Sequence, residues 1–119
     1  MLLVDDDAAY RRSLHAFLDA SYDIRVVGDT GDGIEAVRLA QTLRPDAVVV
    51  DLAMPGVGGI DTAAEIVKAL PGTVIVVVTG ADDTDERKRG TQAGVAAWLP
   101  KGDPLKVENA VRSLVRKRN

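Results

Sequence analysis

Hydrophobic residues in this chain fall into short continuous runs, separated by longer segments of mixed polarity. Two of the runs, at 46–51 and 73–79, are rich in valine and show no alternation of apolar and polar positions. Such runs are typical of parallel strands that are buried on both faces of a sheet. The pattern predicts five strands, at residues 2–4, 24–27, 46–51, 73–79 and 95–99. The run at 24–27 is more mixed than the others, which is expected of an edge strand.

The segments between these runs repeat apolar residues at spacings of three and four, as amphipathic helices do. Leu14, Phe17 and Leu18 would form the buried face of the first helix. Asp103 and Pro104 suit the cap and the first turn of the last helix, which ends in basic residues. Helices are therefore predicted at 8–20, 33–43, 59–70 and 82–93, and after Asp103.

The predicted helix at 82–93 differs from the others because it has no large apolar residue and is interrupted by Gly90. A helix with so little apolar surface gains little from packing. We therefore expect this helix to be short, shallow and mobile.

Strands that alternate with helices predict βαβ units and an α/β fold. Right-handed crossovers favour a doubly wound sheet with helices on both faces. For five parallel strands we expect the flavodoxin-like order 2-1-3-4-5, with a site where strands one and three end. Residues 1–119 are long enough for one domain, and the last few residues could begin a linker.

Composition narrows the class of protein. Hydrophobic residues make up 46% of the chain and charged residues 28%, an ordinary balance for a globular protein. The net charge of -3 argues against a nucleic-acid or anionic-membrane binder, and the absence of cysteine excludes disulfides and thiolate metal sites. Nothing resembles a signal peptide or an apolar run of roughly 20 residues, so we expect a soluble cytoplasmic protein with no membrane partner.

Polar residues follow the predicted strands at one edge of the sheet. Asp5 and Asp6 follow the first strand, Asp51 ends the third, Thr79 ends the fourth, and Lys101 follows the fifth. The carboxyl ends of parallel strands share an edge, so these side chains should lie close together.

Electrostatics limits what such a cluster can do. Two carboxylates ~4 Å apart repel each other by about 4 kcal/mol at an effective dielectric constant of 20, so the acids must take up protons or hold a cation. Oxygen ligands without histidine or cysteine favour Mg²⁺. Asp51 could then attack phosphorus to form an aspartyl-phosphate, while Lys101 and Thr79 bind the phosphoryl oxygens.

Four motifs occur in order along almost the whole chain, and together they are specific. They are "VDDD" (4–7), "VVVDLAMPGVGGID" (48–61), "VVVTG" (76–80) and "WLPK" (98–101). With them the chain resembles the receiver domains of two-component response regulators, and most closely those of the LuxR type (NarL/FixJ-like).

The resemblance implies that Asp51 is the phosphoacceptor and that the cofactor is Mg²⁺. It makes Asp6 a direct metal ligand, gives Asp5 an outer role through water, and adds the backbone carbonyl of Ala53 as a further ligand. Asp7 is the least constrained of the three consecutive acids and could simply cap the first helix.

The resemblance also implies a switch. Thr79 would bind a phosphoryl oxygen and move, Lys101 would pair with the phosphoryl group, and Trp98 would take the aromatic switch position, where tyrosine or phenylalanine is commoner. Ala53 and Ala81 occupy the two variable positions beside the phosphoryl group. Neither can orient an attacking water, so we expect a long-lived phosphoryl group.

The implied partners are a sensor histidine kinase, a second copy of the chain on phosphorylation, and DNA only through an effector domain outside this sequence. The chain would be a phosphorylatable switch rather than an enzyme, assisting only its own phosphorylation and dephosphorylation. His15, the single histidine, is expected on the surface or between helices, away from the acidic cluster.

Three alternatives remain open. A Mg²⁺-dependent phosphatase of the haloacid-dehalogenase type also uses an aspartate nucleophile, but needs a second acid where this chain has Ala53. A flavodoxin-like electron carrier needs a phosphate-binding loop where Asp5, Asp6 and Asp7 would repel phosphate. A degenerate receiver would act as an interaction module without phosphorylation.

Overall fold

The computed structural model describes residues 1–52, 58–81 and 83–118. In this part of the chain, five parallel strands form one sheet in the order β2-β1-β3-β4-β5, as predicted. The strands are β1 (Leu2–Val4), β2 (Gly28–Thr30), β3 (Ala47–Asp51), β4 (Val74–Thr79) and β5 (Ala97–Pro100). The helices are α1 (Ala8–Asp19), α2 (Gly33–Leu43), α3 (Gly59–Ala69), α4 (Thr84–Ala93) and α5 (Pro104–Lys117).

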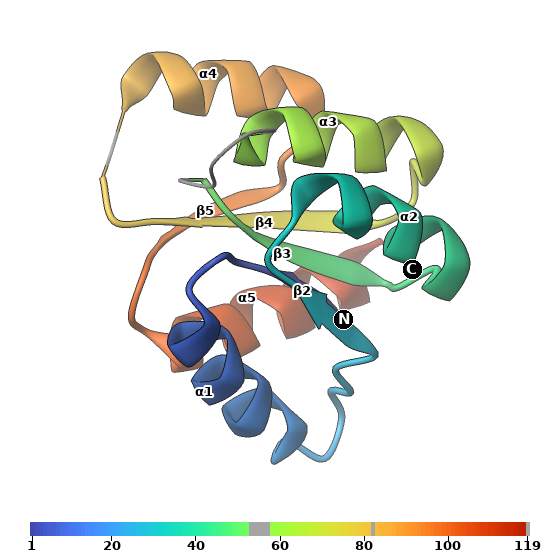
Figure 1. The fold of residues 1–119 in the computed structure, drawn as a ribbon, viewed down its shortest axis with the longest axis vertical. Helices are drawn as coiled ribbons and strands as arrows, with labels where there is room; N and C mark the ends of the chain where they lie inside the picture. Colours follow the sequence, from blue (N-terminus) through green and yellow to red (C-terminus); the bar gives the residue numbers. More distant parts are fainter. Residues whose placement is uncertain (53–57, 82, 119) are drawn as a thin grey trace.

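Helices cover both faces of the sheet (Figure 1). Helices α1 and α5 lie on one face, and α2, α3 and α4 lie on the other. Successive residues of β3 alternate between the two cores: Val48 and Val50 pack with α2 and α3, whereas Val49 packs on the side of α1 and α5. Both faces of the central strands are therefore buried, which explains why their sequences are continuous apolar runs.

Strand β2 is the element that the sequence analysis placed wrongly. The apolar residues 24–27 precede the strand, and Gly28–Thr30 pair in parallel with Leu2–Val4. Val26 is buried on the α1 side, where its backbone N–H donates to the Asp19 carboxylate at 3.0 Å. Ile24 packs against the same core, whereas Arg25 and Val27 are exposed, so only alternate residues of this run lie beneath the sheet. The edge strand itself can be polar because it has one neighbour and an exposed side.

Aspartates set the starts of four helices, since each accepts a hydrogen bond from a backbone N–H in the first turn. Asp7 caps α1, as predicted, and Asp103 caps α5; the other two are Asp32 and Asp83.

The prediction that Phe17 belongs to the buried face of α1 was wrong. Leu14 and Leu18 are buried, but Phe17 is 40% exposed.

Helix α4 is shallowly packed, as its lack of large apolar residues predicts. Gly90 is buried, while its other residues, all of them described, are partly or fully exposed. The carboxyl ends of the strands lie together at one side of the molecule, and the two ends of the chain lie toward the opposite side (Figure 1). In the part of the chain that the structure describes, no helix is both long and apolar enough to cross a membrane.

Candidate functional site

Three acidic side chains meet where β1 and β3 end. Val4 pairs with Val50 in neighbouring strands, so the residues that follow them, Asp5 and Asp51, emerge side by side. Asp5, Asp6 and Asp51 each offer a carboxylate oxygen, and these atoms lie within 4.8 Å of one another. Asp5 and Asp51 are buried, whereas Asp6 is exposed. The geometry suits a cation held by oxygen ligands.

Lys101, which follows β5, brings a positive charge to this cluster. Its Nζ donates to Asp51 Oδ2 at 3.1 Å and to Asp5 Oδ1 at 3.3 Å. Burial lowers the pKa of the Lys101 ammonium, but its hydrogen bonds to the two carboxylates outweigh that effect and raise it overall. The lysine is therefore held in its charged form beside the acids.

The environment of the Asp5 carboxyl disfavours its charged form. Burial raises its pKa, and hydrogen bonds from the Asp7 backbone and from Lys101 only partly offset the increase. Its Oδ2 lies 3.1 Å from Lys101 Nζ, yet accepts no hydrogen bond of normal geometry from the described residues. A buried carboxylate oxygen with spare acceptor capacity fits a site that binds a hydrated cation.

The three consecutive aspartates have three different positions. Asp5 points into the cluster, where its Oδ1 also accepts the Asp7 N–H at 2.9 Å. Asp6 is exposed at the mouth of the cluster. Asp7 turns away, and its carboxylate accepts the Tyr10 N–H at 3.1 Å. The short hydrogen-bonded turn thus orders Asp5 and begins α1 at the same time.

A glycine allows α3 to start against the end of β3. A Cβ at Gly59 would lie 2.5 Å from the Asp51 backbone oxygen and 2.7 Å from the Leu52 Cα. No larger residue fits there without a shift of backbone. Gly59 therefore lets the start of α3 pack directly against the backbone at the end of β3.

Of the two residues predicted to form the switch, Thr79 lies next to the cluster, since its carbonyl oxygen accepts the Lys101 backbone N–H at 3.0 Å. Thr79 Oγ1 donates to the Ala81 carbonyl oxygen at 2.6 Å and accepts the Ala81 N–H at 3.1 Å, so this hydroxyl is engaged with its own loop. Trp98 and Thr79 line a common cavity of 270 Å³. The Trp98 ring packs against Gly90 of α4, and its Nε1 donates to Thr91 Oγ1 at 3.3 Å. Ala53, the predicted carbonyl ligand, is outside the described residues.

Two residues near the cluster were missed by the sequence analysis. The Tyr10 ring lies beneath Lys101, with 4.7 Å between Nζ and the ring centroid. Arg11 donates to the Asp5 carbonyl oxygen and, through Nε, to Asp29 Oδ1 at 2.8 Å. Both lie near the start of α1, and the rotation of that helix, which decides what they contact, cannot be read from the sequence pattern.

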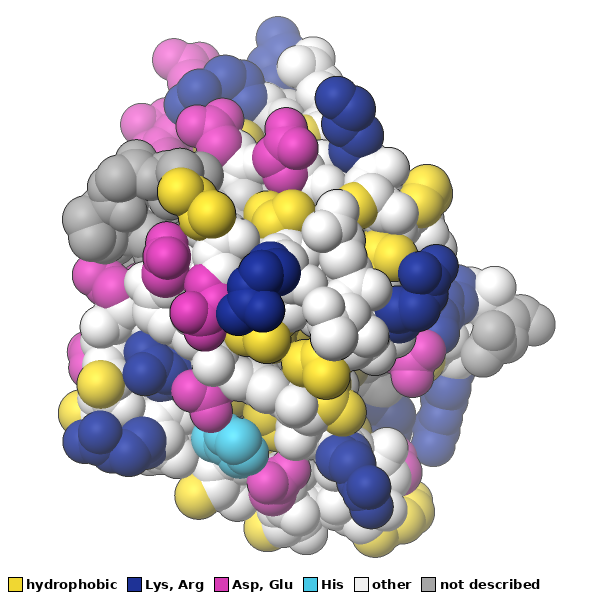
Figure 2. Space-filling model, turned by 45° about the vertical axis from the view of Figure 1, so that its right-hand side comes forward, with side chains coloured by type: hydrophobic (Ala, Val, Ile, Leu, Met, Phe, Trp, Pro, Cys, Tyr) yellow, Lys and Arg dark blue, Asp and Glu magenta, His cyan; other side chains and the backbone are white. Residues whose placement is uncertain are grey.

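His15 lies on the surface at the junction of α1 and β2, as expected. Its Nδ1 is 2.7 Å from Asp29 Oδ2, and its Nε2 is 3.1 Å from Asp19 Oδ2. In Figure 2 the histidine side chain is flanked by acidic ones, and acidic and basic groups are interspersed over the rest of that face. Lysine and arginine therefore form no continuous field among the described residues seen there.

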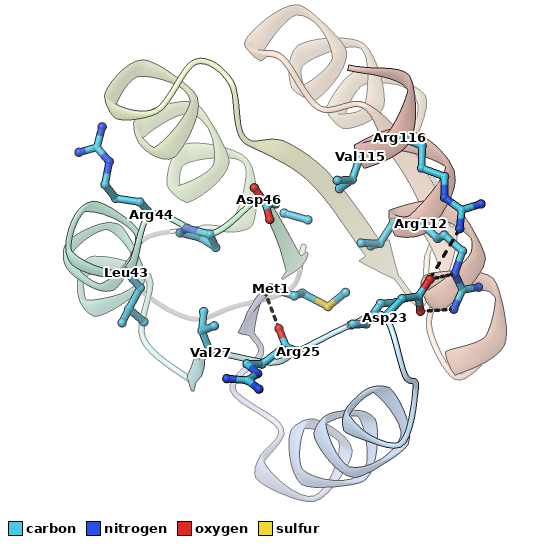
Figure 3. Close-up of a pocket in the computed structure, with 14 residues that line it drawn as sticks. Met1, Asp23, Arg25, Val27, Leu43, Arg44, Asp46, Arg112, Val115 and Arg116 are labelled. Carbon is cyan, nitrogen blue, oxygen red and sulfur yellow. Dashed lines mark hydrogen bonds and ion pairs between the residues drawn. The ribbon is translucent and has the colours of Figure 1, made fainter. Parts of the chain in front are cut away.

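A separate cavity of 460 Å³ opens at the opposite edge of the sheet (Figure 3). Val111 and Val115 of α5 line it together with several arginines, and Arg112 is paired with Asp23 across its rim. The described residues that line it include none of the acidic cluster. This cavity is thus distinct from the site where the predicted residues meet.

Comparisons with family models and with curated proteins identify the same family. The response regulator receiver domain family matches residues 1–112. The chain is 38% identical over 114 residues to the transcriptional regulatory protein LiaR of Bacillus subtilis, covering 95% of this chain and 54% of LiaR. It is 33% identical over 115 residues to the response regulator UvrY of Escherichia coli, covering 96% of this chain and 53% of UvrY.

A solved structure agrees with these relatives. The LuxR-family two-component response regulator from Aurantimonas superposes with a TM-score of 0.90 at 28% identity, covering 99% of this chain and 85% of that one. The chain spans about half the length of the curated relatives it matches. The similarity is to response regulators, so it lends no support to the phosphatase or the electron-carrier alternative.

Proposed function

The chain belongs to the response regulator receiver family, whose members are phosphoacceptor signalling domains, and we propose that Asp51 accepts the phosphoryl group. One observation carries this assignment. The Asp51 carboxylate is buried at the end of the central strand β3 and is held 3.1 Å from Lys101 Nζ, next to two further acids. This site therefore combines a fixed nucleophile with a cation that can stabilise phosphoryl oxygens.

In the transfer step, an Asp51 carboxylate oxygen forms a bond to phosphorus while the bond from phosphorus to the donor breaks. The electron pair of that bond leaves with the donor, which is the imidazole of a phosphohistidine when a sensor kinase is the partner. Lys101 balances the negative charge that accumulates on the phosphoryl oxygens. Thr79 supplies a hydroxyl to one of these oxygens after it leaves the Ala81 carbonyl.

The residues present fit Mg²⁺, which when bound neutralises charge on the phosphoryl oxygens and on the acids. Asp6, exposed and at the mouth of the cluster, is the proposed direct protein ligand together with Asp51. Asp5 is already engaged by Lys101 and by the Asp7 N–H, which suits an outer role through water. The Ala53 carbonyl is proposed as the third protein ligand on the strength of the family motif alone.

Thr79 and Trp98 are the proposed switch. Movement of the Thr79 hydroxyl toward a phosphoryl oxygen would break its hydrogen bond to Ala81 and change the cavity that it shares with Trp98. Trp98 contacts α4, in which only Gly90 is buried, so its displacement would alter the surface formed by α4 and β5. A small energy difference is enough to move such a helix.

We infer the signalling output and the partners of the chain from its family. Residues 1–119 are proposed to be one receiver domain, phosphorylated by a sensor histidine kinase and controlling transcription through an effector domain outside these residues. A change of the α4–β5 surface could then favour a homodimer. LiaR is a transcriptional regulatory protein of which this chain covers 54%, which supports such an output.

Trp98 fluorescence tests the proposal, because this is the only tryptophan and it lines the cavity beside Thr79. We expect emission to change on addition of Mg²⁺ and again on addition of acetyl phosphate. Asp51→Asn should abolish the second change. An unresponsive wild-type protein without a phosphoryl adduct would contradict the assignment and favour a degenerate receiver. Turnover of p-nitrophenyl phosphate would favour a phosphatase.

A further inference from the structure

Tyr10 occupies the first turn of α1, directly beneath the Lys101 ammonium, with 4.7 Å between Nζ and the ring centroid. We propose that Tyr10 is a positioning residue for phosphoryl transfer, holding the Lys101 ammonium toward Asp51 through a cation–π contact. The inference rests on the proposed function only in making Lys101 a phosphoryl-binding group. The contact itself is independent of that role.

The ring is well placed to act as a fixed platform. Its backbone N–H is bound by the Asp7 carboxylate, which sets Tyr10 at the start of α1. Its body packs against the core beside α1 and α5. Tyr10, Leu14 and Leu18 are spaced by four residues, so the ring continues the buried stripe of the helix up to the acidic cluster.

The phenol oxygen does not explain why an aromatic residue stands there. It is buried and has no hydrogen bond of normal geometry to the described residues. Burial raises the pKa of the phenol, although the backbone of Gly102, the residue after Lys101, opposes this effect. The hydroxyl therefore contacts at most the Gly102 backbone, whereas the ring face contacts the Lys101 ammonium.

An aromatic ring suits this position better than a further carboxylate would. Asp5, Asp6 and Asp51 already place three acids within a few ångströms. A fourth acid would add to their repulsion and compete for the same cation. The ring face attracts an ammonium through its quadrupole, adds no net charge, and offers no strong ligand atom to a hard metal ion.

The ring also matters because of what happens to Asp51. As an acyl phosphate, Asp51 no longer presents the carboxylate that now binds Lys101. The Tyr10 ring is unaltered by the reaction and keeps one side of the ammonium in place. Lys101 can therefore contact a phosphoryl oxygen without a large loss of side-chain entropy.

The contact can be measured in the metal-free protein. The ε-methylene protons of Lys101, assigned by comparison with Lys101→Met, should show an upfield ring-current shift in the wild type and in Tyr10→Phe. Tyr10→Leu should lose this shift. Tyr22→Leu provides the matched control, because the Tyr22 side chain is 94% exposed.

The functional effect is a change in rate rather than in metal affinity. With acetyl phosphate at saturating Mg²⁺, Tyr10→Leu should be phosphorylated about 3- to 10-fold more slowly, whereas Tyr10→Phe and Tyr22→Leu stay within about twofold of the wild type. The Mg²⁺ affinity of all three variants should change by less than about twofold. In a Lys101→Gln background, Tyr10→Leu should cause no further loss.

The role of Tyr10 and the proposed function would be refuted by different results. A wild-type rate in Tyr10→Leu, or a missing ring-current shift in the wild type, would overturn the role of Tyr10. So would a loss of rate that persists in the Lys101→Gln background, since the ring would then act through the fold. A wild-type protein that takes up no phosphoryl group would instead refute the proposed function, while the ring-current experiment would still test the contact.

Discussion

Asp5 is only 4% exposed, although it carries a carboxyl group and lies next to Asp51 and Asp6. Burial raises its pKa, so the ionised form that binds a cation is the form that the fold disfavours. For a carboxyl whose pKa is higher in the folded protein, stability falls as the pH rises from the unfolded pKa to the folded one. The charge needed at neutral pH is therefore obtained at the expense of stability.

Asp5→Asn should consequently stabilise the Mg²⁺-free protein by about 0.5–2 kcal/mol, because it removes a buried negative charge and keeps an acceptor for the Asp7 N–H. Urea denaturation at pH 7 measures this, and the same variant should bind Mg²⁺ more weakly. Glu65→Gln, at an exposed position of α3, is the control and should change stability little. A less stable Asp5→Asn protein would show that the Lys101 pair outweighs the repulsion.

At the scale of elements, α4 packs against β5 through the contact between Gly90 and the Trp98 ring. The Trp98 ring of β5 enters the space above Gly90, where a Cβ would lie 2.4 Å from its Cζ2 and 2.7 Å from its Cη2. The sequence showed Gly90 only as a weak point in a helix. The structure gives it a second role, since the missing side chain is what lets the proposed switch residue pack against α4.

Gly90→Ala tests this packing, because two effects of opposite sign compete. Alanine favours a helix over glycine by about 1 kcal/mol, but displacing a packed ring typically costs about 1–3 kcal/mol. We expect the clash to prevail, with a net loss of stability in urea denaturation and altered Trp98 emission. Gly72→Ala is the control, because a Cβ there would meet nothing within 4 Å. A stabilised Gly90→Ala protein would mean that the ring moves aside freely.

Strand β2 is attached to α1 through Asp29, which accepts from Arg11 and contacts His15. Burial works to raise the pKa of Asp29, but hydrogen bonds from His15 and Arg11 outweigh it and lower the pKa below its usual 3.8. For a carboxyl with a lowered folded pKa, the stabilisation is present above the unfolded pKa and is lost as the pH falls through the folded one.

Asp29→Asn should therefore cost about 1 kcal/mol at pH 5, and its difference from the wild type should shrink below pH 3.8 and vanish at lower pH. Chemical denaturation at a series of pH values follows the difference, with Glu65→Gln again as the control. A difference that does not shrink as the pH falls below 3.8 would rule out the ion pair as its source.

At the scale of the whole molecule, the meeting of Asp5, Asp6, Asp51 and Lys101 could be predicted because parallel strands end at one edge. The sheet order followed from the flavodoxin-like fold expected of five alternating strands. That argument needs only the chain order of strands and helices, which hydrophobic patterns report well. It does not need the rotation of any helix or the exact register of an edge strand.

The sequence-based predictions were wrong or incomplete where helix rotation or the register of the edge strand decides a residue's position. Ile24 and Val26 are apolar because they pack in the core below β2, and a pattern alone cannot separate this from a strand. Phe17 lies beside the stripe of Leu14 and Leu18 rather than within it, and the same helix rotation places Tyr10 under Lys101. The roles proposed for Asp51, Thr79, Trp98 and the metal ligands remain predictions to be tested.

The most direct test of the central claim is to locate the phosphoryl group. The protein is treated with acetyl phosphate and Mg²⁺, the acyl phosphate is reduced with borohydride, and tandem mass spectrometry identifies the aspartate that has become homoserine. The account predicts conversion at Asp51 and none in Asp51→Asn. Conversion at Asp5 or Asp6, or no conversion in a folded wild-type protein, would contradict it.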